Sequence, residues 1–205
     1  MKAYVMEFMG TFFLVFAVGL TGNPLAIGLM LAVMIYAGGH ISGAHYNPAV
    51  TLAVWLRGKL DAKEVAPYWL SQIAGAFAAA LIIYLFTEKT FAPVPAEGLA
   101  VWKAVTAEVI CTFALATVVL SVATARKLEG NYIYGLAIGL TVTACAYCVG
   151  SISGGAFNPA VAIGPMVMDV IKGGVLIGNL WIYVVGCLAG GALAAYGFKF
   201  LNTEG

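Results

Sequence analysis

The sequence predicts an all-α membrane protein built from two inverted repeats. Its 205 residues are 62% hydrophobic and only 9% charged, whereas a soluble domain has roughly 25% charged residues. The segment 26–50 recurs at 137–161, with 13 of 25 positions identical and no gap. The nearly neutral chain, with a formal net charge of +1, lacks the clustered basic surface that nucleic-acid binding needs.

The apolar stretches predict three membrane spans in each half of the chain, because a span takes about 20 apolar residues. The predicted spans are residues 4–21, 25–43, 66–86, 101–125, 132–150 and 176–201. Two shorter apolar segments, 48–57 and 159–170, are predicted to be re-entrant half-helices. An odd number of spans per half makes the second half enter the membrane from the opposite side, which gives an inverted repeat.

The whole chain is predicted to be one domain, 1–205. Repeat one covers about 1–86, a linker with two prolines covers about 87–100, and repeat two covers about 101–205. The first helices of the two repeats also match, since 6–12 parallels 107–113. The N-terminal stretch is not interpreted as a signal peptide, because Glu7 interrupts its apolar region and the segment has a counterpart in repeat two.

The basic residues predict the orientation in the membrane. One side collects seven of them, Lys2, Arg57, Lys59, Lys63, Arg126, Lys127 and Lys199, and the other collects three, Lys89, Lys103 and Lys172. Cytoplasmic loops carry the excess of lysine and arginine, so both termini are predicted to be cytoplasmic.

An Asn-Pro-Ala motif begins each predicted half-helix. Asparagine is a preferred N-cap and proline favours the first helical position. Two such starts meeting at mid-membrane direct the positive ends of two helix dipoles to one point. Each asparagine oxygen is expected to cap its helix, which leaves the amide N–H groups for a passing solute. The motifs are Asn47, Pro48 and Ala49, and Asn158, Pro159 and Ala160.

Glycine-rich stretches precede both motifs. Non-helical backbone at membrane depth is tolerated where it is covered by protein or lines water, so these carbonyls are candidate acceptors along a pore. Such a pore suits small neutral polar solutes, because it offers no charged ring to replace the hydration shell of an ion. The carbonyls in question belong to Gly43, Ala44, His45, Gly154, Gly155 and Ala156.

Glu7 and Glu108 are intramembrane carboxylates at equivalent repeat positions. A charge at this depth is costly and marks a function by default. We expect each to accept N–H groups from the irregular loop before its half-helix, since those donors would otherwise be left without partners in an apolar setting. The alternative is a proton relay.

No metal site and no cofactor are predicted. His40 and His45 have no nearby carboxylates or cysteines in the sequence to complete a metal site, so they are expected to brace the loop, with pH sensing at the cytoplasmic mouth as the alternative. The cysteines fall inside apolar stretches and are expected to be small buried hydrophobic residues. They are Cys111, Cys145, Cys148 and Cys187.

The motifs resemble those of the aquaporin, or major intrinsic protein, family. The resemblance rests on GHISGAHYNPAVT at 39–51, on GGAFNPAV at 154–161, and on the Glu-x-x-x-Thr segments that begin at Glu7 and Glu108. It implies six spanning helices with two half-helices, one pore in each monomer and a homotetramer in the lipid bilayer. It also implies passive conduction of water or small uncharged solutes.

The resemblance also implies a selectivity filter that departs from the family's usual pattern. Counting from each asparagine places it on Ile27, Ala146, Gly155 and Val161. The family usually has arginine where this chain has Val161, and the common bacterial water channels have Phe, His and Arg at three of these positions. A wider, apolar filter is therefore expected. Glycerol facilitators have the pattern NPA-Arg-Asp at the second motif instead. With valine at this position, the chain is similar to some plant vacuolar-type members, which conduct water with ammonia, urea or hydrogen peroxide.

The sequence thus predicts a channel rather than an enzyme, since no nucleophile–base pair or metal cluster is recognisable. Two alternatives stay open. One is an alternating-access transporter, in which Glu7 and Glu108 would form the coupling site. The other is a structural family member that conducts nothing.

Overall fold

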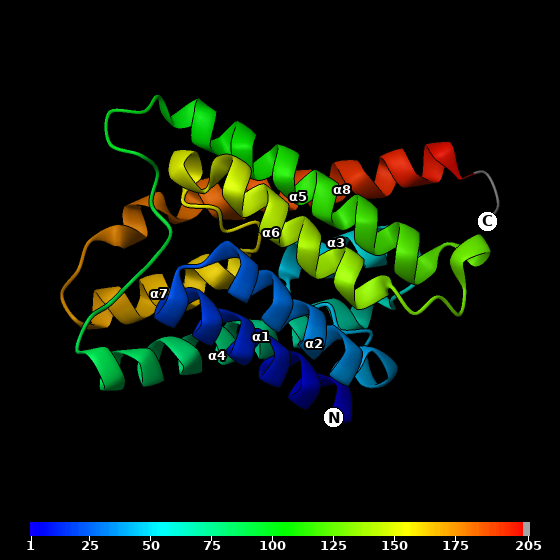
Figure 1. Ribbon diagram of the computed structural model, residues 1–205, viewed down its shortest axis with the longest axis horizontal. Coiled ribbons are helices and arrows are strands. Elements are labelled where there is room, and N and C mark those ends of the chain that lie inside the picture. Colours follow the sequence, from blue (N-terminus) through cyan, green and yellow to red (C-terminus); the bar gives the residue numbers. More distant parts are fainter. Residues whose placement is uncertain (203–205) are drawn as a thin grey trace.

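The computed structural model describes residues 1–202, and within them it contains α-helices and two short 3-10 turns but no strand (Figure 1). Residues 203–205 of the predicted second repeat lie outside the described part. The elements are α1 (Lys2–Thr21), α2 (Pro24–Ser42), α3 (Pro48–Leu56), α4 (Ala62–Thr87), α5 (Val101–Thr124), η1 (Arg126–Leu128), α6 (Tyr134–Ser153), α7 (Pro159–Ile171), η2 (Leu176–Asn179) and α8 (Leu180–Leu201).

The six predicted spans are confirmed, because six helical stretches are long and apolar enough to cross a bilayer. Two boundaries differ from the prediction by more than two residues. Helix α4 begins at Ala62 rather than near 66, since its first turn carries charged residues that apolar patterning overlooks; among them, Glu64 suits the positive end of the helix dipole. Helix α6 continues to Ser153, where Gly154 ends it with a left-handed φ of 90°.

The half-helices α3 and α7 meet at their N-termini in the middle of the bundle and extend toward opposite ends of it (Figure 1). Each packs against the last helix of the other repeat, α3 on α8 and α7 on α4. Glycines permit this close approach. A Cβ at Gly191 on α8 would collide with the Ala49 backbone, and one at Gly164 on α7 would collide with the Ala76 backbone.

The spans pair in the same way in both repeats. Helix α1 packs on α4 as α5 packs on α8, and α2 packs on α6 across the interface between the repeats. At that interface Gly28 lies against the backbone of Gly139. The two repeats therefore share one bundle, with the half-helix starts at its centre.

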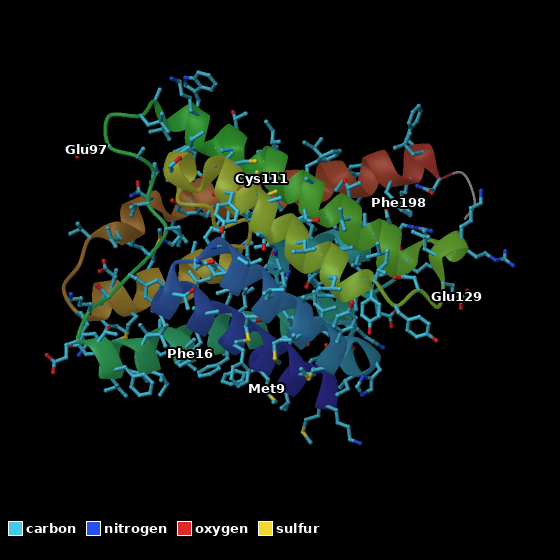
Figure 2. All side chains as sticks on the ribbon, in the orientation of Figure 1. Met9, Phe16, Glu97, Cys111, Glu129 and Phe198 are labelled. Atoms are coloured by element: carbon cyan, nitrogen blue, oxygen red, sulfur yellow. The ribbon has the colours of Figure 1, made fainter. Side chains whose placement is uncertain are left out.

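The outer faces of the spans carry large apolar side chains that the bundle leaves exposed, such as Met9 on α1, which Figure 2 labels, and Ile110 on α5 and Leu193 on α8. This pattern is that of an integral, multi-pass membrane protein. Cys111, Cys145 and Cys187 are buried as expected, whereas Cys148 is exposed. The prediction of a buried thiol was wrong there, because apolar residues on a spanning helix face lipid as well as the core.

Candidate functional site

The two motif asparagines occupy equivalent positions at the starts of the half-helices. Asn47 and Asn158 both have extended backbones with φ of −158°. The Asn47 Oδ1 accepts the N–H of Ala49 at 2.8 Å, and the Asn158 Oδ1 accepts that of Ala160 at 2.9 Å. Each side-chain oxygen thus caps its half-helix.

The amide nitrogens of the same two side chains tie the half-helix loops together. Asn47 Nδ2 donates to the Phe157 carbonyl at 2.8 Å, and Asn158 Nδ2 donates to the Tyr46 carbonyl at 2.8 Å. An asparagine amide has two N–H bonds, so one remains for a solute. The prediction that both N–H groups of each asparagine are available to a solute was wrong, because a carbonyl of the facing loop accepts one of them.

Glu7 on α1 is fully buried and accepts four hydrogen bonds. Its Oε1 accepts the Ser42 hydroxyl at 2.6 Å and the His45 N–H at 2.9 Å. Its Oε2 accepts the Tyr46 N–H at 2.6 Å and the Gln72 amide at 2.8 Å. A carboxylate has about four acceptor positions, so this one is fully used within the protein.

Glu108 on α5 makes the equivalent set in repeat two and is likewise fully buried. Its Oε1 accepts the Ser153 hydroxyl at 2.7 Å and the Ala156 N–H at 3.1 Å. Its Oε2 accepts the Phe157 N–H at 2.7 Å and the Cys187 thiol at 3.5 Å. Both carboxylates therefore hold the loops before the half-helices, which leaves them poorly placed to relay protons.

The loops held in this way have an unusual backbone. Tyr46 and Phe157, the residues before the asparagines, have left-handed φ values of 49° and 51°. Such values are costly for bulky residues and persist only when the surroundings enforce them. The two carboxylates accept N–H groups of these loops, whereas six loop carbonyls have no partner within residues 1–202 and are available to a solute. These carbonyls belong to Gly43, Ala44, His45, Gly154, Gly155 and Ala156.

One tyrosine completes each loop, and sequence reasoning missed both. The Tyr68 hydroxyl donates to the Ser42 carbonyl at 2.8 Å, and the Tyr183 hydroxyl donates to the Ser153 carbonyl at 2.6 Å. The sequence could have identified the two serines as equivalent, because Ser42 and Ser153 lie in identical Ile-Ser-Gly segments of the two repeats. The tyrosines also match, since five of the 13 positions in 68–80 are identical to those in 183–195, but the offset there is 115 rather than 111, so the ungapped repeat did not pair them.

Repeat one has an additional polar cluster around Thr51. Its hydroxyl lies 3.1 Å from His45 Nδ1 and accepts the Gln72 amide at 2.9 Å. His45 is 9% exposed and packs beside the Tyr68 ring, which places it as a brace of the loop. His40 is exposed near the end of α2, and within residues 1–202 the hydrogen bonds of this cluster do not include it.

A cavity of about 500 Å³ runs past both asparagines. Its wall includes all four proposed filter residues, Ile27, Ala146, Gly155 and Val161. Of the six loop residues whose carbonyls were predicted to face a pore, all but Gly43 line it. No Asp, Glu, Lys or Arg within the described chain lines it. Sequence reasoning missed two polar residues of the wall, Tyr147 and Ser151, which follow the filter residue on α6.

Comparison with known proteins decides the family. A sequence model of the major intrinsic protein family matches residues 1–198. The chain belongs to the major intrinsic protein family. It is therefore a membrane channel of the aquaporin family, whose members generally transport water and small solutes.

Proteins similar to this channel include aquaporins of archaea and plants. It is 33% identical to aquaporin AqpM of Methanothermobacter thermautotrophicus over 99% of this chain and 98% of that protein. It is 36% identical to aquaporin NIP2-1 of Oryza sativa over 100% of this chain and 72% of that protein. Its fold is similar to that of the aquaglyceroporin of Plasmodium falciparum, with a TM-score of 0.86, 23% identity, and coverage of 97% of this chain and 95% of that one.

Proposed function

We propose that this channel conducts water and small uncharged solutes passively, through one pore in each monomer with a wide, apolar outer filter. The observation that carries the proposal is one cavity that holds both asparagines and the four filter positions, with no Asp, Glu, Lys or Arg of residues 1–202 in its wall. The candidate solutes beyond water are ammonia, urea, hydrogen peroxide and glycerol. We further propose a homotetramer with both termini in the cytoplasm.

The central asparagines supply the barrier to cations in this proposal. Each half-helix places about half an elementary positive charge at its N-terminus, and the asparagines that cap both N-termini line the cavity. One N–H of each asparagine is committed to the opposite loop, which fixes the direction of the other. A water molecule between these donors must present its oxygen to both, which interrupts a proton-conducting chain of waters.

The outer filter sets the solute range in this proposal. Val161 follows the second motif and is 4% exposed, packed into the wall beside the cavity. An aliphatic side chain at this position offers no hydrogen bond and no positive charge, so it neither orients water nor narrows the passage as a guanidinium would. Urea and glycerol should therefore pass along with water.

Stopped-flow measurements on proteoliposomes test the filter. We expect flux of water and at least one larger solute, such as urea or glycerol, through the wild-type protein. Val161→Arg should lower the flux of that solute about tenfold, which corresponds to about 1.4 kcal/mol on the barrier, and should lower water flux less. Val175→Arg is the matched control, because Val175 is 83% exposed and does not line the cavity. Passage of water alone, unchanged by Val161→Arg, would refute the wide filter.

A further inference from the structure

A second, smaller cavity lies at the end of the bundle where α3 and α8 finish. It has a volume of about 110 Å³ and shares no residue with the pore cavity. Three basic residues from two separate elements face it, and no Asp or Glu of the described chain does. Its lining residues are Arg57, Ala125, Arg126, Lys127, Phe198, Leu201 and Asn202.

Arg57 is the innermost of these cations. Its guanidinium carbon lies 5.1 Å from the centre of the Phe198 ring, which Figure 2 labels on α8. Its Nε is buried and has no hydrogen-bond partner within residues 1–202. No carboxylate of the described residues lies within 4 Å of Arg57 or Arg126. A buried N–H of a guanidinium without an acceptor is costly, and residues 1–202 supply no acceptor for the Nε–H of Arg57.

A purely structural role for Arg57 does not account for this arrangement. Two carbonyls in the last turn of α3 already have backbone partners, since Gly58 N donates to Trp55 O at 2.8 Å and Lys59 N donates to Val54 O at 3.0 Å. Within residues 1–202, no hydrogen bond joins Arg57 to the carbonyl of Leu56. The Arg57 side chain is therefore not needed to cap the helix. An ordinary surface arginine would also keep its Nε in water, which this one does not.

We propose that this cavity binds a phosphate group, and that its source is the headgroup of an anionic phospholipid. The planar guanidinium matches phosphate oxygens with paired hydrogen bonds. Leu201, at the rim, is 76% exposed and gives the cavity an apolar edge on which an acyl chain can lie. Under the predicted orientation the cavity faces the cytoplasmic leaflet, where anionic lipids are enriched. A soluble phosphate would use the same cations, so the test separates the two sources.

The test uses the purified full-length channel in neutral detergent, with its thermal unfolding followed by tryptophan fluorescence. The protein is titrated with short-chain phosphatidylglycerol, with short-chain phosphatidylcholine and with inorganic phosphate. Phosphatidylglycerol should raise the unfolding temperature in a saturable way. In the double variant Arg57→Gln/Arg126→Gln, half-maximal stabilisation should need about tenfold more lipid, because two charge-assisted hydrogen-bonding groups are lost.

Two further proteins serve as controls. Lys89→Gln/Lys103→Gln removes two charges from the opposite end of the bundle and should titrate like the wild type. A chain that ends at Asn202 keeps every lining residue but lacks Glu204, an acidic residue two positions on, and should bind at least as tightly as the full chain. Water flux through each variant in proteoliposomes shows that it has folded.

The outcomes are distinct. Saturation by phosphatidylglycerol alone supports a lipid site, whereas equal competition by inorganic phosphate supports the phosphate site but reassigns its source to solution. The proposal fails if phosphatidylcholine stabilises the protein as well as phosphatidylglycerol does. It also fails if both double variants weaken binding equally, or if the Arg57/Arg126 variant titrates like the wild type. None of these results bears on conduction, which rests on the other cavity.

Discussion

The loops that precede α3 and α7 have the same backbone but different supports. In each, a buried glutamate accepts a serine hydroxyl and two consecutive backbone N–H groups. The fourth partner differs, since Gln72 donates to Glu7 and the Cys187 thiol donates to Glu108. Beyond the glutamate, repeat one adds a cluster around Thr51, where repeat two has Ala162.

This difference shows which parts of the duplicated element the backbone requires. The glutamate and serine satisfy N–H groups and hold left-handed residues, and no apolar residue can replace them. The outer supports are free to diverge. His45 and Ala156 are equivalent and both line the cavity, so an imidazole stands in repeat one where repeat two has a methyl group. Repeat two is also the one whose loop and half-helix contribute Gly155 and Val161 to the proposed filter.

Removing the shared glutamates should have the largest effect. In Glu7→Gln or Glu108→Gln, the new amide NH₂ must face a backbone N–H in either orientation, since both carboxylate oxygens accept one. We expect each change to cost about 3 kcal/mol or more of unfolding free energy, because at least one buried donor loses its acceptor and meets another donor. Thermal unfolding in detergent measures the loss.

The control for these variants is Glu97→Gln, because Glu97 is exposed in the linker (Figure 2). A wild-type unfolding temperature for either buried variant would show that the carboxylate is not what holds its loop. A large loss for one variant only would show that the two loops are not equivalent at their core.

The next effect concerns ion exclusion. Asn47→Asp and Asn158→Asp place a carboxylate oxygen against the carbonyl of Phe157 or Tyr46, where the amide now donates. A negative charge also cancels the positive end of the half-helix dipole. We expect cation or proton leak to rise about tenfold in both, which corresponds to about 1.4 kcal/mol on the barrier. Conductance across planar bilayers and a pH-sensitive dye in liposomes measure it.

Asn23→Asp is the matched control, because Asn23 caps α2 with its oxygen and an aspartate keeps that bond. Since the two central asparagines make mirrored bonds, their leaks should be of similar size. Unchanged ionic conductance in both variants would count against the central barrier.

The support that only repeat one possesses should have a smaller effect. Thr51→Val keeps the shape of the side chain but removes the hydroxyl that faces His45 and accepts from Gln72. We expect a loss of about 1–3 kcal/mol of unfolding free energy, since buried donors are left short of an acceptor. Denaturant titration in detergent measures it, and Thr21→Val, which removes a hydroxyl bonded only within α1 and the turn after it, is the control. Loss of stability equal to the control would mean that the cluster is not a support.

The thiol of repeat two should matter least. Cys187→Ala removes one weak donor to Glu108, at 3.5 Å, while its stronger partners remain. We expect about 1 kcal/mol or less of lost unfolding free energy, because a thiol is a weak donor. The same denaturant titration applies. A cost above that of Thr51→Val would reverse the ranking of the two supports.

Much of this could be predicted from the sequence because the relevant physics is local. An asparagine followed by proline favours a helix start, as it does at all three such pairs in this chain, and the length of an apolar stretch decides whether it spans. The duplication then paired Asn47 with Asn158 and Glu7 with Glu108. The cross-bonds from the asparagines to the Phe157 and Tyr46 carbonyls could not be predicted, because they join residues about 110 positions apart that meet only when the repeats interlock.

The sequence alone determined the membrane environment, the two repeats and the residues that begin the half-helices, since composition, periodicity and capping depend on neighbouring residues. Only the tertiary structure decided how those starts face each other, and it did so through the glycines that let α3 pack on α8 and α7 on α4. It also decided which donors stay free for a solute. Polar groups at membrane depth must find hydrogen-bond partners within the protein or in a water-filled cavity. Whether a donor is available to a solute therefore depends on which acceptors the fold places beside it.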